Sequence, residues 1–295
     1  MCIAFWRWFD APGDGAARFI LAFNRDEYYD RLTRGFHIWD SQPNICAPRD
    51  MEPAAEAEQG SWIGANRRGL LALLTNYREA IPPATGAISR GALVRDFLLD
   101  TPATPGGHAI TAQSNTQIVR EYAERVFDER ALYSGFNLVL FDLASAHGDA
   151  WYVTNRGDGG GAVRCLPRSC PAGLSNSTID RPWAKVDRGL QAFTEATADG
   201  SCASKPAIDK VVQLMADTGP FSAARPPQQL ADLEQCIFVP PLHGGIKGLR
   251  SGEYGTRTTH VLLLRGHELT IVEHNHDTPG ATPKTIRFLL DIPSL

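Results

Sequence analysis

Long hydrophobic runs and a surplus of one charge are both missing from this chain. Apolar stretches such as CIAFW, at residues 2–6, fall far short of the about 20 apolar residues that a membrane-spanning helix needs. The 29 basic and 33 acidic residues leave a formal net charge of -4, and the basic residues are scattered along the chain. We therefore expect no transmembrane segment and no nucleic-acid partner.

Cysteine is also scarce, and no C-x-x-C pair is present. The six cysteines are Cys2, Cys46, Cys165, Cys170, Cys202 and Cys236. They are too few for a disulfide scaffold in a chain of 295 residues, so reduced thiols are expected. The first residues lack the basic lead and the small-residue cleavage site of a secretory signal. We expect a cytoplasmic protein, and association with the surface of an organelle stays open.

The composition favours a globular protein with one large core. Hydrophobic residues make up 43% of the chain and charged residues 21%, which excludes a disordered or fibrous chain. The linker-like stretches are short, and no internal repeat is visible. We predict a single domain over residues 1–295.

Strand-like and helix-like segments alternate in batches. Runs rich in branched and aromatic residues predict strands at residues 2–9, 18–23, 62–66, 69–76, 136–143, 150–155, 260–266 and 269–275. Amphipathic patterns predict helices at residues 89–100, 115–126, 181–198 and 205–219, the last with a stop at Gly219. This order favours an α+β fold of antiparallel sheets packed between helices, and not a doubly wound parallel sheet.

The first two strands are predicted to form a hairpin. The turn-rich segment DAPGDGAA joins them, so residues 2–9 should pair antiparallel with residues 18–24. The end of the second strand then returns beside Cys2. On an extended strand, Asn24 and Asp26 share one face, and Arg25 and Glu27 share the other.

Cys2 can become an N-terminal nucleophile if Met1 is removed. A free thiol has a pKa near 8.5, so only a small fraction is thiolate at neutral pH. An α-amine on the same residue, with a pKa near 7.7–8.0, can take the proton of the thiol. A carboxylate has to orient that amine, and Asp26 is the candidate. The alternative is an ordinary solvated turn at residues 24–27.

Several blocks in a specific order resemble the N-R-D-E protein family, also called the transport and Golgi organisation protein 2 family. The blocks are MCIAFW at the start, AFNRDE at 22–27, GSWIGANRRGLLALLTNYRE at 60–79, SRG at 89–91, GFNLVL at 135–140, GLSNS at 173–177 and YGTRTTHVLLL at 254–264. The family in turn is similar to N-terminal-nucleophile hydrolases of the choloylglycine hydrolase and penicillin V acylase type. The resemblance implies a four-layer αββα fold, with helices outside two stacked, mainly antiparallel sheets.

The resemblance also implies roles for individual residues. Cys2 matches the nucleophile and Asp26 the carboxylate that holds its amine. Asn76 and Asn176 match asparagines of the acyl site and oxyanion hole, and Arg257 is similar to a late arginine near the nucleophile. The acylases carry an arginine three residues before the aspartate, where this chain has Phe23, so the role of Arg25 does not carry over.

Two functions follow from the resemblance. The first is a cysteine amidase that acts on a hydrophobic acyl amide and needs no cofactor. The alternative is a non-catalytic factor that binds or carries haem or a lipid in the same pocket, because family members are linked to Golgi organisation, mitochondrial lipid metabolism and haem movement. Trp6 and Trp8 share the Cys2 face of their strand, either as sheet packing or as an apolar wall for such a ligand.

Three histidines allow a weaker hypothesis. His274 and His276 lie on one strand face at a spacing compatible with a metal, although a structural or surface role is favoured because no third ligand pattern is near. His260 is interpreted as a core histidine, with axial ligation of haem as the alternative.

Overall fold

The computed structural model describes residues 1–9, 16–79, 87–99, 114–145, 150–198, 205–222, 224–244, 246–278 and 280–292. Its strands are β1 (Cys2–Trp8), β2 (Ala17–Tyr28), β3 (Thr33–Ile38), β4 (Ile45–Asp50), β5 (Ile63–Asn66), β6 (Leu70–Asn76), β7 (Phe136–Asp142), β8 (Ala150–Thr154), β9 (Ala162–Leu166), β10 (Ala172–Leu174), β11 (Tyr254–Arg265), β12 (Glu268–Asn275) and β13 (Lys284–Leu289). Its α-helices are α1 (Gly91–Leu99), α2 (Asn115–Asp128), α3 (Ala184–Ala196) and α4 (Lys205–Met215).

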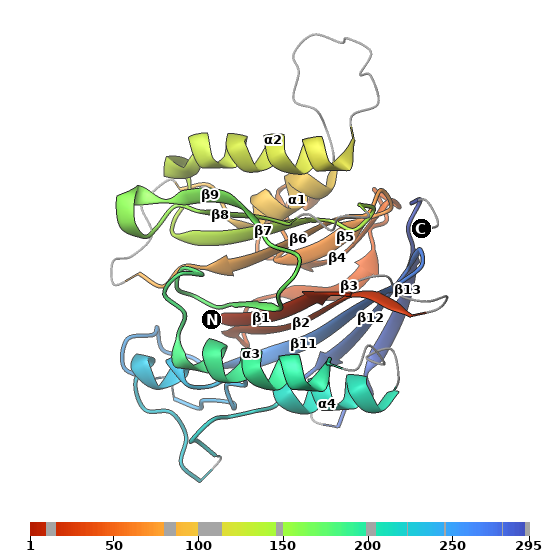
Figure 1. Ribbon diagram of the computed structural model, residues 1–295. Helices are drawn as coiled ribbons and strands as arrows, with labels where there is room; N and C mark the ends of the chain where they lie inside the picture. The colour runs from red at the N-terminus through yellow and green to blue at the C-terminus, as the bar shows by residue number, and fades with distance from the viewer. Residues whose placement is uncertain are drawn as a thin grey trace. The chain divides into compact units, whose positions relative to one another are not determined.

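The chain forms two compact units, each built on one sheet (Figure 1). Unit 1 combines Met1–Leu32 with Ser169–Phe288, and unit 2 contains Thr33–Arg168 and the chain from Leu289 onward. The single domain predicted for residues 1–295 stays a prediction.

The sheet of unit 1 has the strand order β10-β1-β2-β11-β12-β13. The predicted hairpin is confirmed, because β1 and β2 pair antiparallel from Cys2 opposite Arg25 to Trp8 opposite Phe19. β11 then pairs antiparallel with the other edge of β2. The central strand β2 is buried from Ala17 to Asp26, so the last residues of its buried run lie beside the first residues of β1.

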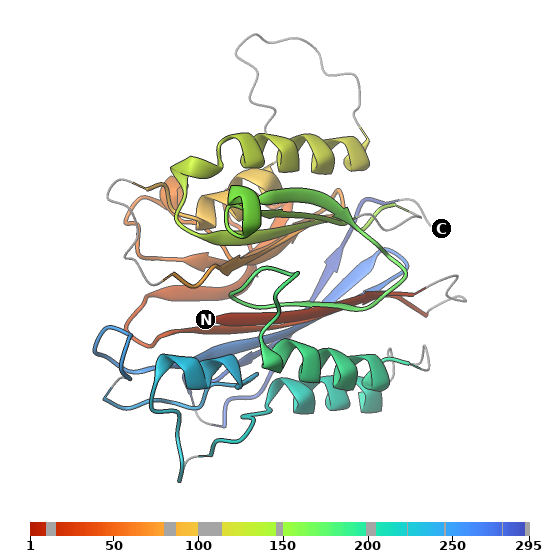
Figure 2. The same cartoon turned by 60° about the vertical axis from the view of Figure 1, so that its left-hand side comes forward.

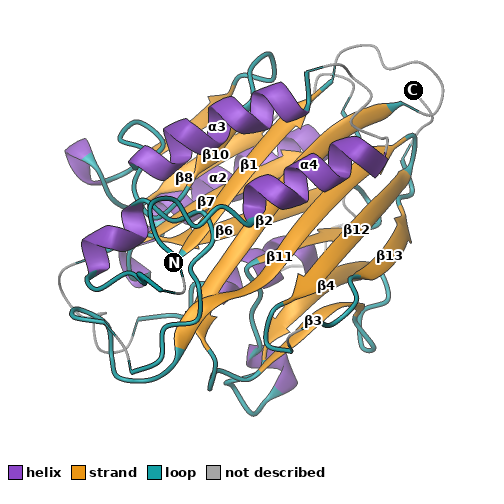
Figure 3. Ribbon diagram, turned by 90° about the horizontal axis from the view of Figure 1, so that it is seen from below, coloured by secondary structure: helices purple, strands orange, loops and turns teal. Residues whose placement is uncertain are grey.

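Helices α3 and α4 cover one face of this sheet (Figure 3). The core below them contains Ile3 and Phe5 of β1 and Phe193 of α3, and the two phenylalanine rings stack 5.7 Å apart. Helix α3 approaches β1 closely at Gly189, where an added Cβ would lie 2.3 Å from Cζ of Phe5. The helix face that contains Gly189 is therefore fitted against Phe5.

Gly189→Ala tests this close approach. Alanine favours a helix interior over glycine by about 1 kcal/mol. Overpacking a buried ring costs about 1–3 kcal/mol, and Phe5 is fully buried, so the clash should prevail and lower the free energy of unfolding by about 1 kcal/mol net. Urea unfolding measures the change. Gln191→Ala, on the exposed side of the same helix, is the control and should not lower it; a more stable Gly189→Ala protein would contradict the packing.

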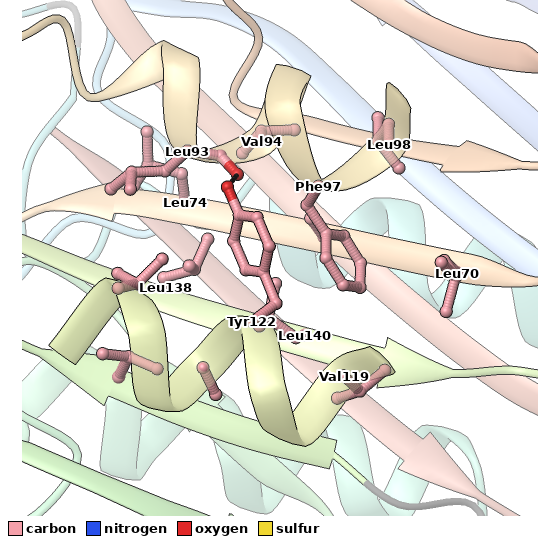
Figure 4. Close-up of a cluster of buried hydrophobic side chains, with 14 of the residues drawn as sticks. Leu70, Leu74, Leu93, Val94, Phe97, Leu98, Val119, Tyr122, Leu138 and Leu140 are labelled. Carbon is pink, nitrogen blue, oxygen red and sulfur yellow. Dashed lines mark hydrogen bonds between the residues drawn. The ribbon is translucent and has the colours of Figure 1, made fainter. Parts of the chain in front are cut away.

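The sheet of unit 2 is an antiparallel meander in the order β3-β4-β5-β6-β7-β8-β9. Helices α1 and α2 pack on its face, α1 on β5 and β6 and α2 on β7 and β8 (Figure 2). Between helices and sheet lies an apolar core in which Phe97 and Tyr122 meet edge to face at 5.0 Å (Figure 4). The hydroxyl of Tyr122 donates to the carbonyl of Leu93 at 2.7 Å, so this buried phenol is satisfied.

The α+β class with two mainly antiparallel sheets is confirmed. Every predicted strand and helix is present, although α4 ends at Met215 and Gly219 lies beyond it with φ of +66° in the following turn. Five strands were not predicted: β3, β4, β9, β10 and β13. They are short, contain charged residues or a proline, or are largely exposed, so their hydrophobic alternation is weak. The described residues contain no helix that is both long and apolar enough to cross a membrane.

Candidate functional site around Cys2

The backbone of Cys2 is held by the segment that follows β10. The amide nitrogen of Cys2 donates to Oδ1 of Asn176 at 2.8 Å, and the Cys2 carbonyl accepts from the hydroxyl of Ser175 at 2.6 Å. All three residues are buried. The structure thus brings together Cys2 and Asn176, which are 174 residues apart in the chain.

Met1 extends the hairpin by one residue. Its carbonyl accepts from the backbone amide of Asp26 at 2.7 Å, and its amino group donates to the Asp26 carbonyl at 2.9 Å. The amino group also contacts the hydroxyl of Tyr254. While Met1 is present, the nitrogen of Cys2 is a peptide amide and cannot accept a proton.

The Cys2 thiol lies in an environment that keeps it protonated. Burial raises its pKa above the usual value, and the Asp26 carboxylate also raises it. The positive charges of the Met1 amino group and of Arg25 act in the opposite direction, as does the backbone amide of Asp26. Because burial prevails, the thiol needs a base before it can attack a substrate.

Asp26 lies buried opposite Thr256 of β11, its partner in the strand register. Its Oδ1 accepts from the Thr256 hydroxyl at 2.6 Å, and the same hydroxyl oxygen accepts from the amide of Val239 at 2.8 Å. No described residue donates a hydrogen bond to Oδ2 of Asp26. Burial raises the pKa of this carboxyl, and the Met1 amino group and Lys185 lower it. One carboxylate oxygen of Asp26 therefore has no hydrogen-bonded partner in the described chain.

Arg25 is the register partner of Cys2, so both side chains lie on the same face of the hairpin. Arg25 is buried and forms an ion pair with Glu27 at 3.4 Å, two residues along the same face. Glu27 also lies 3.9 Å from Arg31. The predicted alternation of residues 24–27 is thus seen, and the positive charge of Arg25 favours the Cys2 thiolate.

Asn24 occupies the opposite, helix-covered face and has a structural role. Its Nδ2 donates to the carbonyl of Met215, the last residue of α4, at 2.7 Å and to the carbonyl of Ile237 at 2.9 Å. Its Oδ1 accepts from the hydroxyl of Thr259 at 2.7 Å. Carbonyls at helix ends have no partner within the helix, so Asn24 satisfies one of them in the core.

Asn24→Asp should therefore destabilise the fold at neutral pH. The substitution removes the two N–H donors and sets a buried carboxylate against two carbonyl oxygens, which we expect to cost about 2 kcal/mol. Burial without donors raises the pKa of the new carboxyl above its unfolded value. Its charging penalty then develops as the pH rises through that raised pKa, so part of the lost stability should return at lower pH. Urea unfolding from pH 4 to 8 measures this; a loss independent of pH would contradict the explanation.

Arg257 lies at an irregularity in the pairing of β11 with β2, between Thr256 and Thr258. Its guanidinium pairs with the carboxylate of Asp277, with an Nε to Oδ1 distance of 2.9 Å. It also donates to the backbone carbonyls of Tyr28 and Arg31, at 3.0 and 2.6 Å. The structure brings Arg257 to these groups, and its contact with the Cys2 thiol stays a prediction.

Asn76 belongs to unit 2, where it is the exposed last residue of β6 and pairs with Phe136 of β7. Cys2 belongs to unit 1. Its assignment to the acyl site stays a prediction.

The three histidines considered in the sequence analysis, His260, His274 and His276, have partners within the protein. Nε2 of His260 lies 3.0 Å from the Glu273 carboxylate in the core, and Nε2 of His276 lies 2.9 Å from the Thr259 hydroxyl. The ring of His274 stacks on that of His276. The part of the chain that the structure describes contains no group of three or more potential metal-ligating side chains.

Sequence reasoning missed Ser175, Tyr254, Thr256 and Lys185. Tyr254 and Thr256 lie in the YGTRTT block, which drew attention to Arg257 alone. Lys185, in the first turn of α3, is fully buried, and the sequence analysis did not single it out. A lysine on the apolar side of an amphipathic helix was the available signal, because lysine is almost never fully buried without a partner.

The chain is similar to proteins of one family over most of its length. Residues 1–278 match the family model described as Transport and Golgi organisation 2. The chain is 34% identical to the Transport and Golgi organization protein 2 homolog of Bos taurus over 269 residues, which cover 90% of this chain and 88% of that protein. It is 32% identical to the Mus musculus homolog over 300 residues, covering 98% and 99%, and 26% identical to the Drosophila melanogaster protein over 285 residues, covering 90% and 88%.

Two solved structures that the chain can be compared with share little sequence with it. The C2A mutant of the conjugated bile acid hydrolase from Clostridium perfringens has a TM-score of 0.43 and 11% identity, covering 99% of both chains. The Caenorhabditis elegans ortholog of N-acylethanolamine-hydrolyzing acid amidase has a TM-score of 0.39 and 8% identity, covering 89% of this chain and 92% of that one.

Proposed function

Because the chain belongs to the Transport and Golgi organisation 2 family, whose resemblance to N-terminal-nucleophile hydrolases directs attention to Cys2, we propose that it is a cysteine amidase acting on a hydrophobic acyl amide. The observation that carries the proposal is the position of Cys2. Its nitrogen is anchored 2.8 Å from Oδ1 of Asn176, at the end of a hairpin that also holds Arg25 and Asp26. Removal of Met1 would turn this anchored nitrogen into an α-amine.

The proposed reaction begins with transfer of the Cys2 thiol proton to the α-amine of the same residue. The thiolate sulfur then attacks the amide carbonyl carbon, and the carbon–nitrogen bond breaks as the ammonium returns a proton to the leaving amine. Water hydrolyses the resulting thioester, with the α-amine again as base, and releases the carboxylic acid and the free thiol. No cofactor is required for these steps.

The neighbouring side chains divide the remaining tasks. Asn176, whose Oδ1 accepts from the Cys2 nitrogen, is the proposed donor to the oxyanion through its Nδ2 group. Asp26 orients the α-amine, and the charge of Arg25 favours the thiolate. Trp6 and Trp8 follow Cys2 on its own strand face and suit a hydrophobic acyl group.

Hydrolysis of a series of fluorogenic N-acyl amides with increasing acyl length tests the proposal. Protein that begins at Cys2 should release the fluorophore, and Cys2→Ser should reduce the rate strongly, whereas Cys165→Ser should not, because Cys165 is an exposed thiol of β9. Asp26→Asn should slow the reaction without unfolding the protein. If no amide is turned over while haem or a lipid binds saturably, the alternative of a carrier replaces the amidase.

A further inference from the structure

Lys185 is a buried lysine that has no hydrogen-bonding partner among the described residues. It is the second residue of α3, its side chain is fully buried, and no described residue accepts a hydrogen bond from its Nζ. The ring of Trp183 lies 5.5 Å from Nζ. A cation near the N-terminus of a helix also opposes the helix dipole. Packing alone does not explain a lysine at this position, because an aliphatic side chain would fill the same space at less cost.

The position of Lys185 directs it toward the Cys2 hairpin. Lys185 lies one helical turn before Gly189, on the face of α3 that packs against Phe5 of β1. Gly189 also approaches Ile237, whose carbonyl accepts from Asn24 on the helix-covered face of β2. Asp26, two residues after Asn24, shares that face. Lys185 and Asp26 are therefore on the same side of the sheet.

Lys185 and Asp26 also complement each other in charge. Oδ2 of Asp26 and Nζ of Lys185 are both buried, and neither makes a hydrogen bond to a described residue. Of the neighbouring groups that favour the ammonium form of Lys185, the Asp26 carboxylate has the largest electrostatic effect. Burial by itself would neutralise each of them, so each charge depends on the other.

We propose that Lys185 is the buried counter-charge of Asp26 and a positioning residue of the Cys2 site. It keeps the Asp26 carboxylate ionised, so that this carboxylate can hold the α-amine of Cys2 after Met1 is removed. The inference rests on the proposed function for the role of Asp26, but the pairing of the two charges does not. The other groups that act on this pair are the Met1 amino group, the Cys2 thiol, Glu27, Glu234 and Cys236.

The ionisation of Asp26 is the direct readout. In full-length protein labelled with ¹³C-carboxyl aspartate, the Asp26 resonance is identified by its loss in Asp26→Asn. Lys185→Met keeps the length of the side chain and removes the charge, and it should raise the titration midpoint of Asp26 by about 1–3 pH units. Lys210→Met, the same substitution at an exposed position of α4, should leave the midpoint unchanged. An unchanged Asp26 midpoint in Lys185→Met would overturn the proposal.

A thermal cycle covers the case in which Lys185→Met does not fold. Removing one of the two buried charges leaves the other buried without a counter-charge, which destabilises the fold. Removing both charges leaves no uncompensated charge. The double variant Lys185→Met/Asp26→Asn should therefore melt at a higher temperature than Lys185→Met, or fold where the single variant does not. Additive losses from the two substitutions would refute the pairing.

A third measurement separates this inference from the proposed function. In protein that begins at Cys2, Lys185→Met should move the pH profile of Cys2 acylation toward higher pH, because Asp26 ionises later. If the titration midpoint of Asp26 shifts but no form of the protein hydrolyses an amide, the pairing of Lys185 with Asp26 is supported and the proposed amidase activity is refuted. If amides are hydrolysed and the titration midpoint of Asp26 does not change, the amidase activity is supported and the proposed role of Lys185 is refuted.

Discussion

Protein that begins at Cys2 should acylate its thiol about 10²–10⁴ times faster than the same protein with Met1 attached, the range that a well-placed general base contributes. The reason is the identity of one nitrogen. With Met1 present, the nitrogen of Cys2 is an amide that donates to Asn176, and burial holds the thiol pKa above its usual value. Without Met1, the same nitrogen is an amine bonded to the Cα of the nucleophile.

A fusion protein that is cleaved directly before Cys2 supplies both forms. The acylation rate is measured by mass spectrometry of the Cys2 peptide after exposure to an electrophilic acyl-amide probe, before and after cleavage. The exposed thiols Cys165 and Cys170 are the internal control, and their labelling should not change. Equal rates at Cys2 in the two forms would refute the N-terminal-nucleophile mechanism.

Arg257→Ala should lower the free energy of unfolding by about 3 kcal/mol, at the lower end of the range for removing one partner of a buried ion pair. The Arg257 side chain is 7% exposed, whereas Asp277 is 27% exposed and recovers some hydration when the arginine is lost. The carbonyls of Tyr28 and Arg31 would also lose their donor. Arg257→Lys should restore only part of the stability. An ammonium group cannot reproduce the planar guanidinium group, which donates to a carboxylate and two backbone carbonyls at once.

Urea unfolding of the Arg257 variants is paired with a pH titration of Cys2 alkylation. We expect the stability to fall while the Cys2 thiol pKa stays constant, since the charges that act on this thiol include Arg25 and the Met1 amino group. Arg250→Ala is a matched control, because its ion pair with Asp30 is exposed and should contribute little to the free energy of unfolding. A Cys2 thiol pKa that rises in Arg257→Ala would instead place the arginine at the site, as the resemblance implies.

The hairpin at the N-terminus could be predicted because its determinants are local. A short turn-rich segment joins two apolar runs, and antiparallel pairing then returns residues 24–27 to Cys2. The period of an extended strand also separates Asn24 and Asp26 from Arg25 and Glu27 without further information. The strand period does not determine whether Asn24 and Asp26 or Arg25 and Glu27 face the helices. Both faces of β2 are buried, so both are equally apolar in the sequence.

The sequence by itself determined the α+β class, the hairpin and the family, because alternation, turn residues and ordered motifs are local properties of the chain. Only the tertiary structure decided that Asn24 caps α4, that Arg257 binds Asp277, and that Lys185 lies on the Asp26 side of the sheet. These partners come from distant segments: Thr256 reaches Asp26 across 230 residues. Periodicity predicts which face a side chain is on, but only the packing of whole elements determines what it meets there.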